Sequence, residues 1–125
     1  MFVCTANSAR SHLAAALWSR TTAIPGVSAG THPATAIDVG AIRVAERHGL
    51  RLPRIRPKHL KDVATAGDFI VTVCDLAHEE LGEKSDAHWS VPDPAPAATA
   101  AAFDAAYDDL SARVGELARL ITVPA

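Results

Sequence analysis

Short apolar runs alternate with amphipathic stretches along this chain. The clearest run covers residues 68–74 and is rich in apolar and β-branched side chains, which is typical of a central strand covered on both faces. Shorter runs at residues 2–4, 26–31 and 88–91 predict three further strands. Because helical stretches separate these runs, the pattern predicts an α/β fold with right-handed βαβ connections and a parallel sheet.

Apolar side chains recur at helical spacing in the segments between these strands. The predicted helices cover residues 11–18, 33–48, 57–63, 77–81 and 99–120. Pro33 begins the second helix and Gly49 ends it, and His48 is placed to complement the dipole at its C-terminal end. The last helix presents one apolar face, formed by Phe103, Tyr107, Leu110, Val114, Leu117 and Ile121.

Composition and charge exclude several classes of function. The 125 residues suffice for one domain whose core needs neither a metal nor a disulfide. A net charge of −2 gives no electrostatic reason to bind nucleic acid or an anionic membrane, and the one basic cluster is interpreted as a solvated surface. That cluster comprises Arg51, Arg54, Arg56 and Lys58.

Neither a membrane-spanning helix nor a secreted disulfide framework is expected. No apolar run reaches the roughly 18 residues that a membrane-spanning helix needs, and no signal-peptide pattern is present. The chain has two cysteines, far apart in sequence, which fits an intracellular thiol enzyme better than a disulfide scaffold. A cytoplasmic location is therefore expected.

Residues 4–11 read Cys-Thr-Ala-Asn-Ser-Ala-Arg-Ser and lie between the first predicted strand and the first predicted helix. Such a turn aims backbone N–H groups at one point and places the positive end of a helix behind them, which suits a tetrahedral oxyanion such as phosphate or arsenate. Cys4 would face that oxyanion as a nucleophile, and the planar guanidinium of Arg10 would bind two of its oxygens. The predicted oxyanion-binding residues are Thr5, Ala6, Asn7, Ser8, Ala9, Arg10 and Ser11.

A free thiol is mostly protonated at neutral pH and is then a weak nucleophile. The helix N–H groups, the Arg10 cation and the Ser11 hydroxyl are all expected to stabilise the thiolate of Cys4. Asn7 tolerates a left-handed conformation and can tie the loop to itself through its side chain. The alternative is an inert core cysteine with Arg10 as a helix cap, but the small loop residues and the flanking elements favour the oxyanion site.

A carboxylate stands between two prolines after the last predicted strand. Asp93 could give a proton to an oxygen that leaves phosphorus or arsenic, and its proline neighbours would fix the backbone that presents it. An Asp before Pro is also a common turn residue. Because ligand sites of parallel sheets lie at the carboxyl ends of strands, Cys4, Cys74 and Asp93 are expected to converge.

The loop at residues 4–11 resembles the signature loop shared by low-molecular-weight protein-tyrosine phosphatases and the arsenate reductases built on the same fold. Asp93-Pro94 is similar to the general-acid Asp-Pro of these enzymes. The segment Ser-Ala-Gly-Thr at 28–31 is similar to a segment that recurs beside their active-site loop. The resemblance covers nearly the whole chain and implies a single domain over residues 1–125. It also implies a three-layer α/β/α fold with a four-stranded parallel sheet.

One loop position departs from the family pattern. The third residue of the loop is usually Gly, and this chain has Ala6. If that position needs a positive φ, alanine there costs about 1 kcal/mol. The first strand is also very short, so either it is truncated or the chain was cut from a longer protein.

The arsenate reductase branch is the closer resemblance. Tyrosine phosphatases of this fold follow Asp-Pro with tyrosines that wall an aryl slot, whereas here Ala95-Pro96-Ala97 follows. The segments 71–75 and 88–95 look like those of arsenate reductases. The resemblance implies that Cys4 forms a thiol adduct with arsenic and that a second thiol attacks Cys4 and releases arsenite. Cys74 is the candidate for that resolving thiol, or else an inert buried residue.

Further departures bear on the reductant and on metal binding. Thioredoxin-linked members carry a third cysteine where this chain has Leu81, and potassium-binding members carry a Glu where it has Ala15. The resemblance therefore implies no metal site, no bound cofactor and an external reductant. That reductant is either a thioredoxin system that cleaves a Cys4–Cys74 disulfide or a small thiol such as mycothiol or glutathione.

Two other functions stay open. A phosphatase would need Cys4, Arg10 and Asp93 and would proceed through a phosphocysteine intermediate without using Cys74. A non-catalytic oxyanion-sensing or protein-interaction domain would keep the loop and lose turnover.

Overall fold

A computed structural model describes residues 1–121 of the chain. Its single sheet has four parallel strands in the order β2-β1-β3-β4, which confirms the predicted four-stranded parallel sheet. The strands are β1 (Phe2–Cys4), β2 (Ser28–Gly30), β3 (Val71–Thr72) and β4 (Ala87–His88). The helices are α1 (Arg10–Thr21), α2 (Val39–Arg47), α3 (Leu60–Val63), α4 (Asp75–Leu81), the 3-10 turn η1 (Gly82–Lys84) and α5 (Ala100–Ile121).

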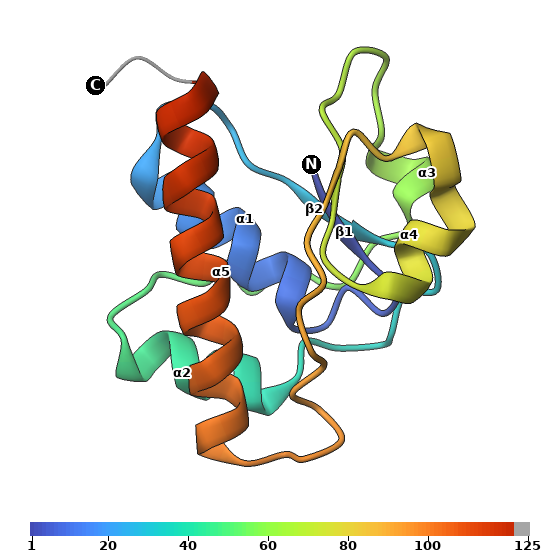
Figure 1. Cartoon of the computed structure of the whole chain (residues 1–125). Coiled ribbons are helices and arrows are strands. Elements are labelled where there is room, and N and C mark those ends of the chain that lie inside the picture. The colour runs from blue at the N-terminus through green and yellow to red at the C-terminus, as the bar shows by residue number, and fades with distance from the viewer. Residues whose placement is uncertain (122–125) are drawn as a thin grey trace.

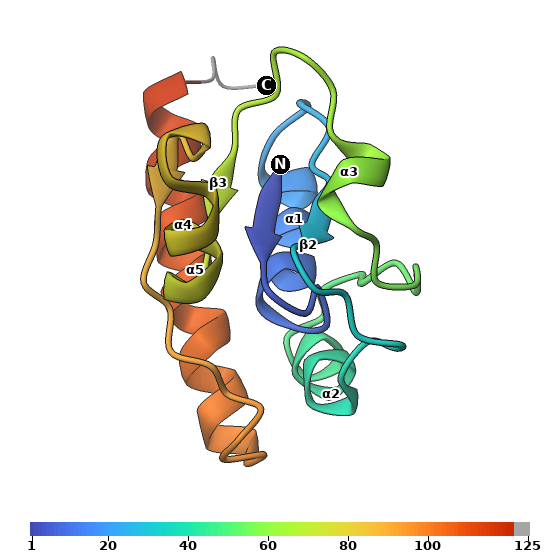
Figure 2. The same ribbon diagram turned by 90° about the vertical axis from the view of Figure 1, so that its right-hand side faces the viewer.

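The sheet lies between two layers of helices. Helices α1 and α5 lie on one side of the sheet, and α3 and α4 lie on the other (Figure 1). Strands β1 and β2 point the same way, so that their carboxyl ends meet at one edge (Figure 2). This arrangement is the predicted three-layer α/β/α fold. No described helix is both long enough and apolar enough to span a bilayer.

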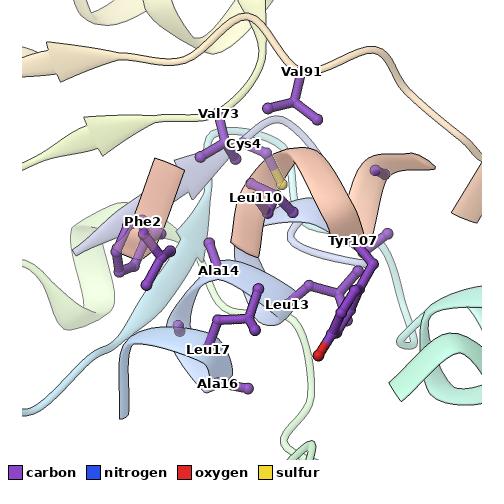
Figure 3. Packing of buried hydrophobic residues seen from close by; sticks show 14 of the residues in the cluster. Phe2, Cys4, Leu13, Ala14, Ala16, Leu17, Val73, Val91, Tyr107 and Leu110 are labelled. Carbon is purple, nitrogen blue, oxygen red and sulfur yellow. The ribbon is translucent and has the colours of Figure 1, made fainter. Parts of the chain in front are cut away.

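The main core lies between α1, α5 and the sheet. Leu13 and Leu17 of α1 face Leu110 and Tyr107 of α5 (Figure 3). All three leucines are almost fully buried. The predicted apolar face of the last helix is confirmed from Phe103 to Val114. Ile121, which the pattern also assigns to that face, is about half exposed, so the prediction is wrong at this end.

The second helix is shorter than predicted. It begins at Val39 and not at Pro33, and the Asp38 side chain caps it by accepting from the N–H of Gly40 (2.8 Å). Its C-terminal end agrees with the prediction, because His48 is the C-cap residue. The His48 ring stacks on Tyr107 with ring centroids 3.9 Å apart, which attaches α2 to α5.

Three strands are also shorter than the apolar runs that predict them, and β2 covers only Ser28–Gly30 of the predicted residues 26–31. Regular pairing in the third strand covers only Val71–Thr72, although Val73 N–H still donates to the Val3 carbonyl (2.8 Å). The run begins with side chains outside the core, and Phe69 is 46% exposed. The predicted strand at 88–91 is displaced to Ala87–His88, and the residues after it form a loop that leads to the site.

Candidate active site

The loop between β1 and α1 is held from outside by the segment that follows β2. The carbonyls of residues 4, 5, 6 and 8 accept hydrogen bonds from the N–H groups of Thr31, His32, Ala34 and Asp38, at 2.8–3.1 Å. These bonds turn the carbonyls away from the centre of the loop and leave the loop N–H groups free to face it. A ring of inward N–H groups next to a helix N-terminus binds an anion.

Asn7 is the left-handed residue of the loop, with φ 50°. Its buried side chain donates through Nδ2 to Ser11 Oγ (2.8 Å) and accepts at Oδ1 from the N–H of Lys58 (2.9 Å). Both properties predicted for Asn7 are therefore present. Among the described residues only Asn7 and Ala98 have a positive φ without being glycine, so Ala6 does not carry the strain considered for it.

The backbone of the loop also lies in close contact with β2. A side-chain carbon added at Gly30 would lie 2.6 Å from the carbonyl oxygen of Thr5, closer than such atoms approach. Glycine at this position therefore allows the neighbouring strand to lie directly against the loop backbone. This close contact explains why the Ser-Ala-Gly-Thr segment at 28–31 has glycine at position 30.

The sulfur of Cys4 is surrounded by hydrogen-bond donors. Its Sγ accepts from the N–H of Asn7 (3.2 Å) and lies 3.0 Å from the hydroxyl oxygen of Ser11. Since Asn7 Nδ2 donates to that same oxygen, the Ser11 hydroxyl is free to direct its own proton to the sulfur. Cys4 is 3% exposed. The loop thus directs one N–H group and one hydroxyl group at the Cys4 sulfur.

Arg10 connects the loop to the segment that carries Asp93. Its Nη1 donates to the Val91 carbonyl (2.8 Å), and its Nη2 lies 3.6 Å from Asp93 Oδ2. The Arg10 side chain is 13% exposed, whereas that of Asp93 is 46% exposed. Asp93 Oδ1 also accepts from the N–H of Ala95 (3.0 Å), which keeps the carboxylate at the mouth of the site.

All four predicted catalytic side chains line one cleft of about 700 Å³. Cys4 and Arg10 come from the loop and the start of α1, Cys74 follows β3, and Asp93 lies in the segment after β4. Among the predicted oxyanion-binding residues, Thr5, Ala6, Ser8 and Ala9 also line the cleft. Asn7 and Ser11 do not; they lie buried behind the loop and support it.

Cys74 is the N-cap residue of α4. Its Sγ accepts from the N–H of Ala77 (3.4 Å) and lies 3.3 Å from the Thr5 hydroxyl oxygen. Both cysteines are free thiols, and both are buried among the residues that line the cleft. The Thr5 hydroxyl thus bridges the loop and the second cysteine.

Sequence reasoning missed Asp75, Ser90 and the Val91 carbonyl. Asp75 lines the cleft and lies 2.9 Å from His88 Nε2, and hydrogen bonds from His88 and then Ser90 lower the pKa of its carboxyl group. Its position directly after Cys74 at a strand end was an available signal. The Val91 carbonyl had none, since any residue offers the same backbone oxygen.

Within residues 1–121, no three His, Cys, Asp or Glu side chains come together as they would around a metal ion. The arrangement instead supplies an anion-binding loop, a sulfur nucleophile inside it, a guanidinium, a carboxyl group and a second thiol. These groups can carry out nucleophilic displacement on a tetrahedral oxyanion with a general acid.

Solved structures with this fold have several activities. An arsenate reductase from Archaeoglobus fulgidus has a TM-score of 0.78 at 27% identity, covering 93% of this chain and 95% of that one. The arginine phosphatase YwlE from Geobacillus stearothermophilus has a TM-score of 0.78 at 26% identity, with coverages of 96% and 90%. The tyrosine phosphatase Wzb from Escherichia coli K30 has a TM-score of 0.84 at 24% identity, with coverages of 96% and 95%, a likeness of fold.

No curated protein matches this chain in sequence. The model of one protein family, by contrast, matches residues 1–123, which is nearly the whole chain. The cleft, the loop and the parallel sheet described above agree with that match. The chain therefore belongs to the low molecular weight phosphotyrosine protein phosphatase family.

Proposed function

We propose that this protein is an arsenate reductase that uses Cys4 as the nucleophile and an external thiol as the reductant. The observation that carries the proposal is the presence of both free thiols in one cleft, with the Thr5 hydroxyl 3.3 Å from Cys74 Sγ. Reduction of arsenate consumes two thiols, whereas hydrolysis of a phosphoester needs one. A second thiol in the same cleft as the nucleophile therefore favours reduction.

In the first step arsenate binds to the loop N–H groups and to Arg10. The Cys4 thiolate attacks arsenic and forms an S–As bond while one As–O bond breaks. The departing oxygen takes a proton from the carboxylic acid form of Asp93, 3.6 Å from the Arg10 guanidinium, and leaves as water. Arsenic remains pentavalent in the resulting adduct.

In the second step another thiolate attacks Sγ of Cys4. An S–S bond forms, the S–As bond breaks, and its electron pair stays on arsenic, which leaves as arsenite. Two thiols have then become a disulfide while arsenic has gained two electrons. With Cys74 as the attacking group the product is a Cys4–Cys74 disulfide, and with a small thiol it is a mixed disulfide on Cys4.

The walls of the cleft support a small substrate. No aromatic side chain is among its described lining residues, so the cleft offers no stacking surface for an aryl group. Leu81 ends α4 where a third cysteine of the relay would be needed. The disulfide must then be reduced from outside, either by a thioredoxin system or by mycothiol or glutathione.

The second candidate function is hydrolysis of a phosphomonoester. The observation in its favour is the pairing of Arg10 with Asp93 at the cleft mouth, since these two groups and Cys4 suffice for that reaction. In that case a phosphocysteine would form on Cys4 and water would hydrolyse it. Cys74 would then have no chemical role.

The test measures arsenite released from arsenate with mycothiol and mycoredoxin, glutathione and glutaredoxin, or thioredoxin and its reductase. The same sample is tested with an aryl phosphate. Arsenite formation with one reductant is the expected result, and Cys4→Ser should abolish it. Cys74→Ser should stop reduction by thioredoxin and leave reduction by a small thiol intact if that thiol attacks Cys4 directly.

Other outcomes contradict the proposal in distinct ways. Cleavage of the aryl phosphate without arsenite formation identifies a phosphatase. If neither substrate turns over, but phosphate still protects Cys4 from alkylation, the protein is an oxyanion-binding module without catalysis.

A further inference from the structure

A second cavity, of about 440 Å³, lies apart from the catalytic cleft and shares no lining residue with it. One wall is the face of α1 that carries Ala15 and Ala16, and the opposite wall comes from the segment between α2 and α3. The two alanines leave space that larger side chains would fill. Val27, Leu50 and Ile55 add apolar surface, so the cavity can take an apolar body.

The charged groups around this cavity all have the same sign. Arg20, Arg51 and Lys58 line it, and no carboxylate is among its described lining residues. Arg20 donates to the hydroxyl of Tyr107 (3.0 Å), while the side chains of Arg51 and Lys58 have no ion pair or hydrogen bond within residues 1–121. Two cations without partners beside an apolar cavity favour an anionic ligand.

A buried polar group in the wall of the cavity also lacks a partner. His12 is 6% exposed, and its Nε2 has no hydrogen-bond partner among the described residues. Burial, together with the nearby Lys58 cation, lowers the pKa of its imidazole, while a hydrogen bond with the Asn7 backbone opposes that shift. Buried polar atoms nearly always have a partner, and a polar ligand atom in the adjoining cavity can supply one.

We propose that this cavity is a second binding site, separate from the oxyanion loop, for a small organic anion with a compact apolar body. The apolar body lies against Ala15, Ala16 and Ile55, and the anionic group binds Arg51 and Lys58. This assignment goes beyond the proposed arsenate chemistry and does not depend on it. It also gives a specific role to two members of a cluster that the sequence favours as mere solvated surface.

The test uses 2-naphthoate as the anionic ligand and 2-naphthamide as its uncharged analogue. Binding is measured by calorimetric titration with the full chain, in excess phosphate so that the oxyanion loop is occupied. We expect 2-naphthoate to bind about tenfold more tightly than the amide, the size typical of one hydrogen-bonded charge. The double variant Arg51→Gln, Lys58→Met should reduce that ratio to less than about twofold.

Two further variants decide between a built site and general attraction. Arg54→Gln combined with Arg56→Gln removes the same charge from the same cluster but replaces no residue that lines the cavity, so the ratio should persist. Ala16→Leu fills the cavity and should abolish binding of both compounds, with the circular dichroism spectrum verifying that the variant folds.

Four results would overturn the proposal. The first three are equal affinity for the acid and the amide, an equal loss in the Arg54/Arg56 variant, and unchanged binding in a folded Ala16→Leu variant. Competition between phosphate and 2-naphthoate would likewise place the ligand in the oxyanion loop and refute a separate site. All of these readouts are independent of turnover, so they stand even if the arsenate assay fails.

Discussion

Replacing Asn7 with alanine tests how the oxyanion loop holds its shape. The variant loses the hydrogen bonds to Ser11 Oγ (2.8 Å) and from the N–H of Lys58 (2.9 Å), each contributing about 1 kcal/mol. Alanine at φ 50° costs about a further 1 kcal/mol, because its Cβ approaches the following carbonyl. The expected loss is therefore about 3 kcal/mol in the free energy of unfolding. For a chain of this length that corresponds to a fall of about 12 °C in Tm.

Asn7→Gly separates the two causes. Glycine adopts the left-handed conformation without strain but makes neither hydrogen bond, so this variant should lose about 2 kcal/mol and be about 1 kcal/mol more stable than the alanine variant. Urea unfolding followed by circular dichroism gives both values, and phosphate protection of Cys4 from alkylation reports the loop itself. An alanine variant within about 0.5 kcal/mol of wild type would refute the hydrogen-bond argument. Equal stability of the two variants would refute the strain argument.

Three further predictions concern other parts of the chain. Asp93→Asn should slow cleavage of any phosphoester substrate by about 10²–10⁴-fold, measured as kcat, if Asp93 donates the proton. Ala98→Gly should raise the free energy of unfolding by up to about 1 kcal/mol in urea, because Ala98 has φ 53° and a glycine at that position would be unstrained. The lowered pKa of His12 means that the folded state binds its proton less readily than the unfolded state. The stability that neutral His12 contributes is therefore complete above pH 6.5, the pKa of an unfolded histidine, and declines as the pH falls below it. Since His12→Asn removes this titration, the variant should show a smaller fall in the free energy of unfolding between pH 7 and 5.

The sequence predicts the chemical parts of the cleft because they depend on local chain order. Cys4 ends β1, Cys74 and Asp93 come after β3 and β4, and the carboxyl ends of parallel strands meet at one edge. The left-handed conformation of Asn7 was also predictable, since Asn tolerates it better than most residues. The sequence order and the intrinsic preference of a single residue were sufficient for these features.

The structure departs from the sequence pattern where distant backbone groups pair. Residues 33–38 have apolar side chains near helical spacing, yet the N–H groups of Ala34 and Asp38 bond to the carbonyls of Ala6 and Ser8. A helix that began at Pro33 would use the Asp38 N–H internally, so the Ser8 carbonyl would lose its partner. The Ala34 N–H would lie in the first turn of such a helix and would have no intrahelical partner. Periodicity cannot reveal such pairing, because it describes side chains and not backbone partners.

The same scaffold can serve two chemistries, and the residues that hold the oxyanion do not distinguish them. The loop N–H groups, Cys4 and Arg10 would bind arsenate and phosphate alike, since both are tetrahedral oxyanions of similar charge. Discrimination must come from the other groups that line the cleft, where this chain has Cys74 and lacks an aromatic wall among the described residues. Hydrolysis ends when water reaches the adduct, whereas reduction ends when a thiol reaches the sulfur of Cys4. Cys74 lies next to Thr5, so we expect its replacement by serine to change the reductant requirement without altering oxyanion binding.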